Sequence, residues 1–154
     1  MTGETGASTR RAVAVGIGHY LPERVVPNSE FEAMVDTSDE WIRQRTGIAE
    51  RYVAGEGETT FTLSLQAAQA ALEVADLDPA YLDLIIVATV TPDYAFPSTA
   101  CLMQERLGLP TTCGALDFNL GCSGYVYGLA LADGLIRTGS VRRVLFITAE
   151  TYTK

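Results

Sequence analysis

Three short runs of apolar, largely β-branched residues recur in the second half of the chain, at residues 82–90, 111–120 and 142–150. Each run is apolar on both of its faces, which is typical of a strand that is covered from two sides. The segments between the runs have helical features, and strands that alternate with helices favour parallel pairing. The sequence therefore predicts an α/β fold: a mostly parallel, mixed sheet with helices on both faces.

The clearest helix is predicted over residues 59–79, where Pro79 ends a long apolar pattern. Further helices are expected over residues 98–108 and 122–139, and a glycine ends each of them. The apolar stripe of the first helix consists of residues at helical spacing: Leu63, Ala67, Ala70 and Val74.

Two short helices are predicted nearer the N-terminus from capping boxes, in which a hydroxyl and a carboxylate three residues apart satisfy free backbone amides. Ser29 and Glu32 form the first box. Thr37 and Glu40 form the second, and Gly47 is expected to end that helix.

Residues 1–11 are small and polar, lack the apolar centre of a signal peptide, and are predicted to be a flexible tail. Residues 12–154 are predicted to form one half-domain that begins with a buried strand at residues 12–17. No apolar run reaches the roughly 18–20 residues that a membrane helix needs. The cytoplasm is therefore the expected compartment, with no membrane as a partner.

Composition narrows the classes of function. The formal net charge of −8 at pH 7 disfavours nucleic-acid binding, which depends on Lys and Arg. Three local arginine clusters are interpreted as ordinary surface, although an acidic partner could dock on one of them. Three cysteines without a CxxC pair, and a single histidine, argue against a disulfide framework and a zinc site, so no metal or cofactor is expected.

Cys122 lies where the second apolar run ends and a helix is expected to begin, between Gly121 and Gly124. Ligands of α/β sheets bind beyond the carboxyl ends of the strands, and a helix N-terminus stabilises a thiolate. The glycines allow a tight turn, and the amide of Cys122 could hold an oxyanion. This pattern favours a nucleophilic cysteine; the alternative is a small cysteine packed between helix and sheet.

The segment DFNLGCSGYVYGLALA, residues 117–132, resembles the active-site segment of the β-ketoacyl-acyl-carrier-protein synthase III family of the thiolase-like superfamily. Three more segments resemble that family in the same order: GIGHYLPERVVPNSEFE, DTSDEWIRQRTGIAERYVA and ATVTPDYAFPSTACLMQERLG. The resemblance covers roughly residues 13–154. It implies that Cys122 accepts an acyl group from an acyl-coenzyme A, and that malonyl-carrier protein then decarboxylates and attacks the acyl-cysteine in fatty acid or polyketide initiation.

The resemblance also implies roles for four other residues. Thr37, Trp41 and Arg45 match positions that contact coenzyme A, the substrate. Trp41 and Arg45 are four residues apart on one helix, so an indole and a guanidinium could form a slot for a purine; the alternative is a surface cation–π pair. Phe96 matches an aromatic residue that reaches across a homodimer to shape the partner's acyl pocket; the alternative is a core Phe.

Several other residues are given no catalytic role. His19 follows the first strand, and the family's catalytic histidine lies much later in the sequence. Cys101 and Cys113 are interpreted as packing residues. Asp117 and Glu150 lie near strand ends but lack a visible partner carboxylate.

The chain resembles only the N-terminal half of the family, whose second half carries a histidine and an asparagine that activate the malonyl group. The chain is therefore expected to be a fragment, a truncated product or part of a cleaved protein, inactive in condensation without the missing C-terminal half. A lone half would expose a large apolar patch. Alternative functions are a non-catalytic partner subunit, a relative that transfers the acyl group to oxygen or nitrogen, and a structural domain.

Overall fold

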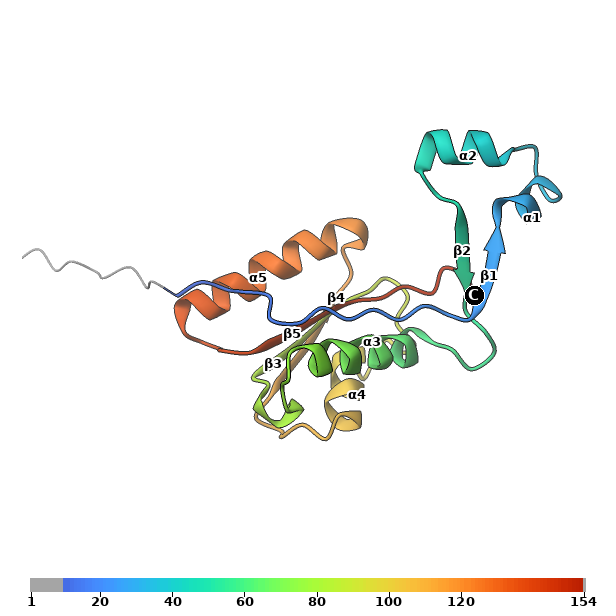
Figure 1. Cartoon of the computed structure of the whole chain (residues 1–154). Helices are drawn as coiled ribbons and strands as arrows, with labels where there is room; N and C mark the ends of the chain where they lie inside the picture. The colour runs from blue at the N-terminus through green and yellow to red at the C-terminus, as the bar shows by residue number, and fades with distance from the viewer. Residues whose placement is uncertain (1–9, 154) are drawn as a thin grey trace, which may run out of the picture. The chain divides into compact units, whose positions relative to one another are not determined.

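The three apolar runs form a parallel sheet in the computed structural model, which describes residues 10–153 (Figure 1). The strands are β3 (Leu84–Ala88), β4 (Gly114–Phe118) and β5 (Val144–Thr148). β3 lies between the other two and pairs in parallel with both. All five residues of β3 are buried, as expected for a strand covered on both faces. The predicted α/β class is confirmed.

Helices cover both faces of this sheet (Figure 1). α3 (Thr60–Val74) and α4 (Thr99–Arg106) pack on one face, and α5 (Gly124–Thr138) packs on the other. Because side chains alternate along a strand, Ile85 and Val87 join the cluster of α3 and α4, whereas Ile86 joins that of α5. The sheet thus separates two hydrophobic cores.

The predicted apolar stripe of α3 is partly wrong. Leu63 is buried as predicted, but Val74 is 65% exposed. The other side of the helix, at Ala67 and Ala71, lies against an extended N-terminal segment. Small residues are needed there because backbone approaches backbone. The buried positions of α3 are Thr60, Leu63, Ser64, Ala68 and Leu72.

The predicted buried strand at residues 12–17 is also wrong. The segment is irregular, and Val13, Val15 and Ile17 are exposed. Within residues 10–153 no strand pairs with it. A Cβ on Gly16 or Gly18 would collide with the backbone of α3, so the alternate small residues lie on the helix while the large ones face outward.

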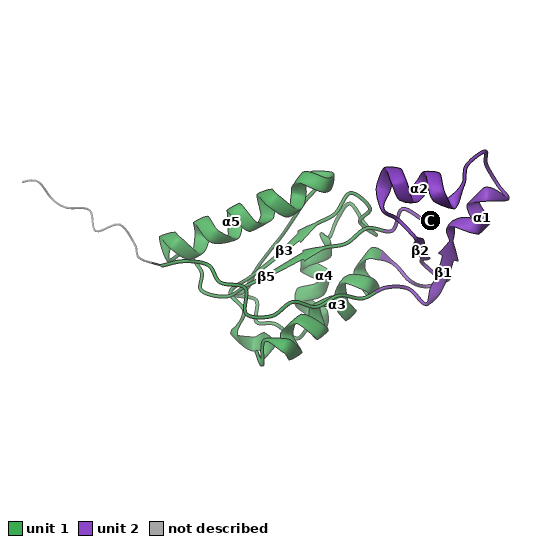
Figure 2. Ribbon diagram, turned by 45° about the horizontal axis from the view of Figure 1, so that its top comes forward, with its two compact units in different colours: residues 1–20, 60–150 green, residues 21–59, 151–154 purple. Residues whose placement is uncertain are grey.

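The chain divides into two compact units, and each is described by itself (Figure 2). Unit 1 comprises residues 1–20 and 60–150, and unit 2 comprises residues 21–59 and 151–154. The expected tail, residues 1–11, lies almost entirely outside the described residues. No helix of the described part is long and apolar enough to span a membrane. The cytoplasmic location stays a prediction.

Unit 2 is built on an antiparallel hairpin of β1 (Arg24–Pro27) and β2 (Glu50–Val53). Between these strands the chain forms α1 (Asn28–Glu32) and α2 (Asp39–Thr46). Both helices are predicted by the sequence, but the hairpin is not.

The predicted capping boxes are wrong, although the helices that they mark exist. Ser29 lies inside α1 rather than before it. Ser38, not Thr37, caps α2, and its Oγ accepts a hydrogen bond of 3.1 Å from the Trp41 amide. Glu32 accepts from the Asp39 amide at 2.6 Å, so it caps the second helix instead of the first. The backbone of Ser38 is extended, as the residue that caps a helix requires.

Candidate active site

Cys122 lies in a short 3₁₀ turn, η2 (Gly121–Ser123), between the end of β4 and the start of α5. Gly121 has φ 56°, a left-handed conformation that favours glycine. The Ser123 hydroxyl donates a 2.7 Å hydrogen bond to the Leu120 carbonyl and closes the turn. The Cys122 side chain is exposed, as a nucleophile requires, and the alternative of a packed cysteine does not fit.

Two buried glycines hold α5 close to the sheet just after Cys122. Gly124 lies against Ala88 and Phe118, and a Cβ on Gly128 would overlap the ring of Phe146. The helix start is thereby fixed on the ends of β3 and β4. The close approach of α5 to these side chains positions the cysteine turn that precedes it.

Asp117, near the end of β4, has a structural role that the sequence does not reveal. Its two carboxylate oxygens accept hydrogen bonds from the amides of Thr99 and Ala100 at 2.6 and 2.8 Å. These amides belong to the first turn of α4, where backbone N–H groups lack helical partners. Asp117 therefore joins the strand that leads to Cys122 to the helix that follows Phe96.

Glu150 has a similar role beyond β5. Its carboxylate accepts from the Thr91 hydroxyl at 2.8 Å and from the Val90 amide at 3.1 Å. The Thr60 hydroxyl in turn donates to the Thr91 carbonyl at 2.5 Å. The start of the loop between β3 and α4 is thus tied to β5 and α3. Neither Asp117 nor Glu150 needs a partner carboxylate for these roles.

Phe96 lies in that same loop and is 89% exposed. A core phenylalanine would be buried, so the alternative role considered from the sequence is wrong for this structure. An aromatic ring held in solvent is costly to hydrate and suits a contact with another molecule. The predicted role across a dimer stays a prediction.

The three predicted coenzyme A residues lie in unit 2, whereas Cys122 and Phe96 lie in unit 1. Trp41 and Arg45 project from α2, and the Arg45 guanidinium carbon is 5.9 Å from the centre of the indole ring. Trp41 is 55% exposed, so its face is available. Thr37 is half-buried just before the cap of α2. The predicted indole–guanidinium pair is therefore present, and its role in binding stays a prediction.

The burial of the other two cysteines tests their predicted packing roles, and the exposure of the histidine is also clear. Cys113 is buried, as predicted, and burial followed by the charge of Asp83 raises the pKa of its thiol. Cys101 is exposed in the first turn of α4, so its predicted packing role is wrong. His19 is exposed.

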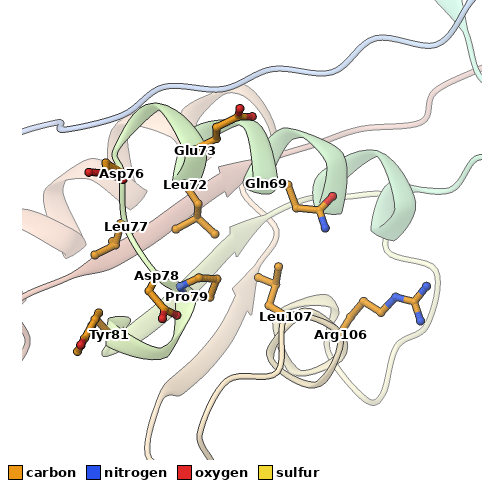
Figure 3. A pocket seen from close by; sticks show the side chains of 10 residues that line it. All are labelled: Gln69, Leu72, Glu73, Asp76, Leu77, Asp78, Pro79, Tyr81, Arg106 and Leu107. Carbon is orange, nitrogen blue, oxygen red and sulfur yellow. The ribbon is translucent and has the colours of Figure 1, made fainter.

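One hollow of unit 1 lies away from Cys122 (Figure 3). It is next to η1 (Pro79–Tyr81), the turn that precedes the first residue of β3. Cys122 instead follows the carboxyl end of a parallel strand, at the opposite edge of the sheet. The lining residues are Gln69, Leu72, Glu73, Asp76, Leu77, Asp78, Pro79, Tyr81, Arg106 and Leu107.

Comparisons with known proteins match nearly the whole chain. The family described as 3-oxoacyl-[acyl-carrier-protein] synthase III matches residues 116–154. A β-ketoacyl-[acyl-carrier-protein] synthase III of Cereibacter sphaeroides is 56% identical over 146 residues, which are 95% of this chain and 45% of that protein. One of Alkalilimnicola ehrlichii is 53% identical over 91% of this chain and 43% of that protein.

Solved structures agree with the sequence matches. The 3-oxoacyl-[acyl-carrier-protein] synthase III of Aquifex aeolicus superposes with a TM-score of 0.85 at 46% identity, over 92% of this chain and 45% of that one. Over the part that it spans, the chain is similar in sequence and fold to β-ketoacyl-[acyl-carrier-protein] synthases III. The priming β-ketosynthase of the R1128 polyketide pathway also superposes, with a TM-score of 0.86 at 33% identity, over 98% of this chain and 45% of that one.

This chain thus spans about 45% of the length of the synthase III relatives that it matches. The part matched by the family description begins within β4 and includes Cys122, α5 and β5. The cysteine turn therefore lies within the segment by which the synthase III family is recognised.

Proposed function

We propose that this chain supplies the acyl-accepting cysteine of a β-ketoacyl-[acyl-carrier-protein] synthase III. The observation that carries the proposal is the exposed Cys122 in a 3₁₀ turn between a parallel strand and a helix, in a chain 56% identical to such a synthase. In the first step the Cys122 sulfur bonds to the acyl carbon of acyl-coenzyme A. The carbon–sulfur bond to coenzyme A breaks, and the departing thiolate takes up the proton that Cys122 loses.

In the second step the carrier protein's malonyl thioester loses carbon dioxide, and the resulting carbanion attacks the acyl-cysteine. A β-ketoacyl thioester forms and the Cys122 thiolate is released. We assign this step to the whole protein, with a C-terminal half that supplies the groups for decarboxylation. Acyl carrier protein and a second copy of the chain are the proposed partners, and no metal or bound cofactor takes part.

Coenzyme A is proposed to bind at α2. An adenine ring would stack on the exposed face of Trp41, with the Arg45 guanidinium beside it to attract a phosphate. Thr37 would contact the same substrate. The exposed ring of Phe96 would line the acyl pocket of the partner subunit.

The test is intact-protein mass spectrometry before and after incubation with a panel of acyl-coenzyme A thioesters. We expect a mass gain equal to the acyl group, which Cys122→Ala abolishes and Cys101→Ala does not. A gain that survives in Cys122→Ala contradicts the assignment.

A second candidate is a priming ketosynthase of a polyketide pathway, because such an enzyme superposes over 98% of this chain. The same panel separates the two: an acyl donor other than acetyl-coenzyme A that reacts at least about tenfold faster would favour the priming role.

A further inference from the structure

Asn28 is a buried polar side chain in unit 2, with only 1% of its surface exposed. It lies at the junction of β1 and α1. Burying an amide is costly unless its donors and acceptor are all satisfied. The role of a buried amide is therefore to be found in its hydrogen bonds rather than in apolar packing.

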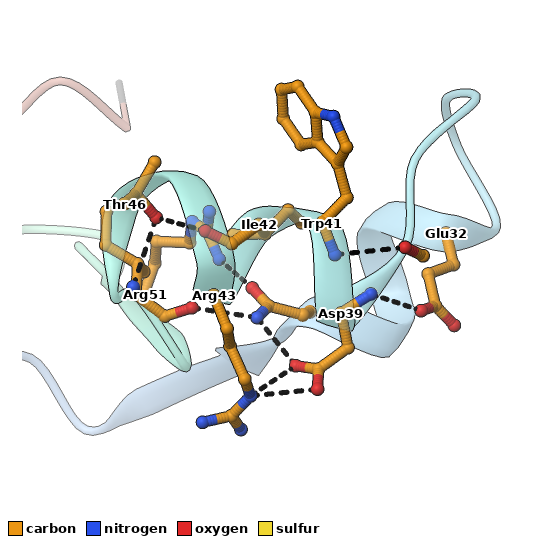
Figure 4. Close-up of polar contacts among 10 residues, drawn as sticks. Glu32, Asp39, Trp41, Ile42, Arg43, Thr46 and Arg51 are labelled. Carbon is orange, nitrogen blue, oxygen red and sulfur yellow. Dashed lines mark hydrogen bonds and ion pairs between the residues drawn. The ribbon is translucent and has the colours of Figure 1, made fainter.

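The amide of Asn28 contacts three separate places. Its Nδ2 donates to the Asp39 carboxylate at 2.8 Å and to the Ile48 carbonyl at 2.9 Å. Its Oδ1 accepts a hydrogen bond from the Arg51 guanidinium. Figure 4 shows these polar contacts around α2. Two donors and one acceptor are used at once, which only a side-chain amide provides.

These contacts hold both ends of one helix. Asp39 is the first residue of α2, and Ile48 comes two residues after its last. Arg51 lies on β2, and its guanidinium also stacks on the ring of Phe31 at 4.5 Å. Asn28 thus fastens the start and the end of α2 to the hairpin beneath it.

α2 cannot hold its own position, because a helix of eight residues is marginal in water without tertiary contacts. Ile42 is its one buried residue, so apolar packing contributes little. Trp41 and Arg45 project from this helix: their separation follows from helical spacing, and the direction in which they project follows from the placement of the helix. The hydrogen bonds of Asn28 constrain that placement at both ends of the helix, whereas the hydrogen bond that Glu32 accepts from a backbone amide acts at its start alone.

We propose that Asn28 is a positioning residue for coenzyme A binding: it orients α2 so that Trp41 and Arg45 form a slot. This inference rests on the proposed function. Asn28 acts through the helix and does not itself touch the substrate.

The test uses the full chain, in which Trp41 is the only tryptophan and reports on the slot directly. Coenzyme A is titrated while Trp41 emission is followed, and amide hydrogen exchange of α2 is measured separately. For Asn28→Ala we expect exchange in α2 to accelerate and the Kd for coenzyme A to rise, each by at least about tenfold. The rate at which iodoacetamide modifies Cys122, in unit 1, should stay within about twofold.

Two matched variants separate positioning from general damage. Gln44→Ala removes another amide of α2, one that donates a hydrogen bond to Glu40 of the same helix, and should leave both readouts unchanged. Asn28→Asp has the same shape but places an oxygen against the Asp39 carboxylate and the Ile48 carbonyl. It should therefore be no better than Asn28→Ala.

Each outcome decides the inference. Unchanged exchange in α2 overturns it whatever happens to coenzyme A, and so does faster exchange with unchanged affinity. Full rescue by Asn28→Asp would mean that Asn28 only fills space. If the unsubstituted chain shows no change of Trp41 emission with coenzyme A, the proposed slot itself fails, and the positioning role fails with it.

Discussion

At the scale of single residues, the three thiols of the chain lie in three different environments. Cys122 is exposed in a turn, Cys101 is exposed on a helix, and Cys113 is buried beneath α4. The thiolate is the reactive form, and burial disfavours it. Reactivity should therefore separate Cys113 from the other two.

We predict that iodoacetamide at pH 8 modifies Cys101 and Cys122 at least about tenfold faster than Cys113, whose pKa is raised by burial and then by Asp83. The Cys113 rate should keep increasing above pH 9, as its thiolate forms late. Peptide mapping by mass spectrometry gives the three rates. Equal rates in the native protein, with complete labelling in urea as the reference, would contradict the assignment.

The second residue-scale prediction concerns Asp39. Hydrogen bonds from Asn28 and then Arg43 hold the pKa of its carboxyl below the ordinary 3.8. The folded state thus favours the carboxylate, so this stabilising contribution is complete above pH 3.8 and disappears as the pH falls through the lowered pKa. We expect Trp41 anisotropy to decrease in that acidic range. Asp39→Asn should remove this decrease from the plot of anisotropy against pH. If the plots of the variant and of the unsubstituted chain superimpose, Asp39 is not its cause.

At the scale of elements, α5 offers a direct measure of how closely a helix must approach the sheet. Gly128 faces the ring of Phe146, whereas Gly134 on the same helix has nothing within 4 Å of a built Cβ. The two positions share helix and residue type and differ in their surroundings. Substitution should therefore act in opposite directions.

We predict that Gly128→Ala lowers the free energy of unfolding by about 1–3 kcal/mol, because the ring must move. Gly134→Ala should instead raise it by about 0.5–1 kcal/mol, since alanine favours the helix. Urea unfolding monitored by circular dichroism provides both midpoints. A stabilising Gly128→Ala would show that α5 does not lie as closely on β5 as described.

The cap of α4 gives another element-scale prediction. Asp117→Ala leaves the amides of Thr99 and Ala100 without their acceptor, so stability should fall by about 1–2 kcal/mol. Ser140→Ala is a suitable comparison, because that hydroxyl bonds to the Thr138 hydroxyl at an exposed helix end. The midpoint of thermal unfolding is measured for both variants. Equal shifts would show that Asp117 does not stabilise α4 as a cap.

The elements of unit 1 are largely predictable from the sequence, because buried strands and long helices have strong apolar patterns. The hairpin of unit 2 is not, since its strands have only four residues each and carry charges. The site divides in the same way. The pairing of Trp41 with Arg45 follows from helical spacing, but Asn28 bonds to Arg51 across 23 positions and Asp117 to Thr99 across 18. Local patterns contain no signal for such contacts.

At the scale of the whole molecule, exposed apolar residues gather on two elements of unit 1. On the N-terminal segment these are Val13, Val15 and Ile17. On α5 they are Tyr125, Val126, Tyr127, Leu129 and Leu131. Exposed apolar side chains bind other apolar molecules, and the large patch expected from the sequence stays a prediction.

We predict that the folded chain enhances the fluorescence of the dye ANS, and that Val126→Ser/Leu129→Ser reduces the enhancement by about half. The reduction should occur without loss of circular dichroism, because both side chains face outward. Val74→Ser, at an exposed position of α3, serves as the comparison and should change the signal little. If the double variant still enhances ANS fluorescence strongly, the dye binds at apolar side chains other than those of α5.

The central position of β3 has a consequence for synthesis on the ribosome. β3 is made first, yet both strands that pair with it come later in the chain. β4 follows after roughly 25 residues, which takes about 1–5 s at the usual rates of translation. For that interval β3, whose five residues are all buried in the folded chain, has no strand to pair with, so early release or slow elongation would favour aggregation at β3 before any defect in the finished fold.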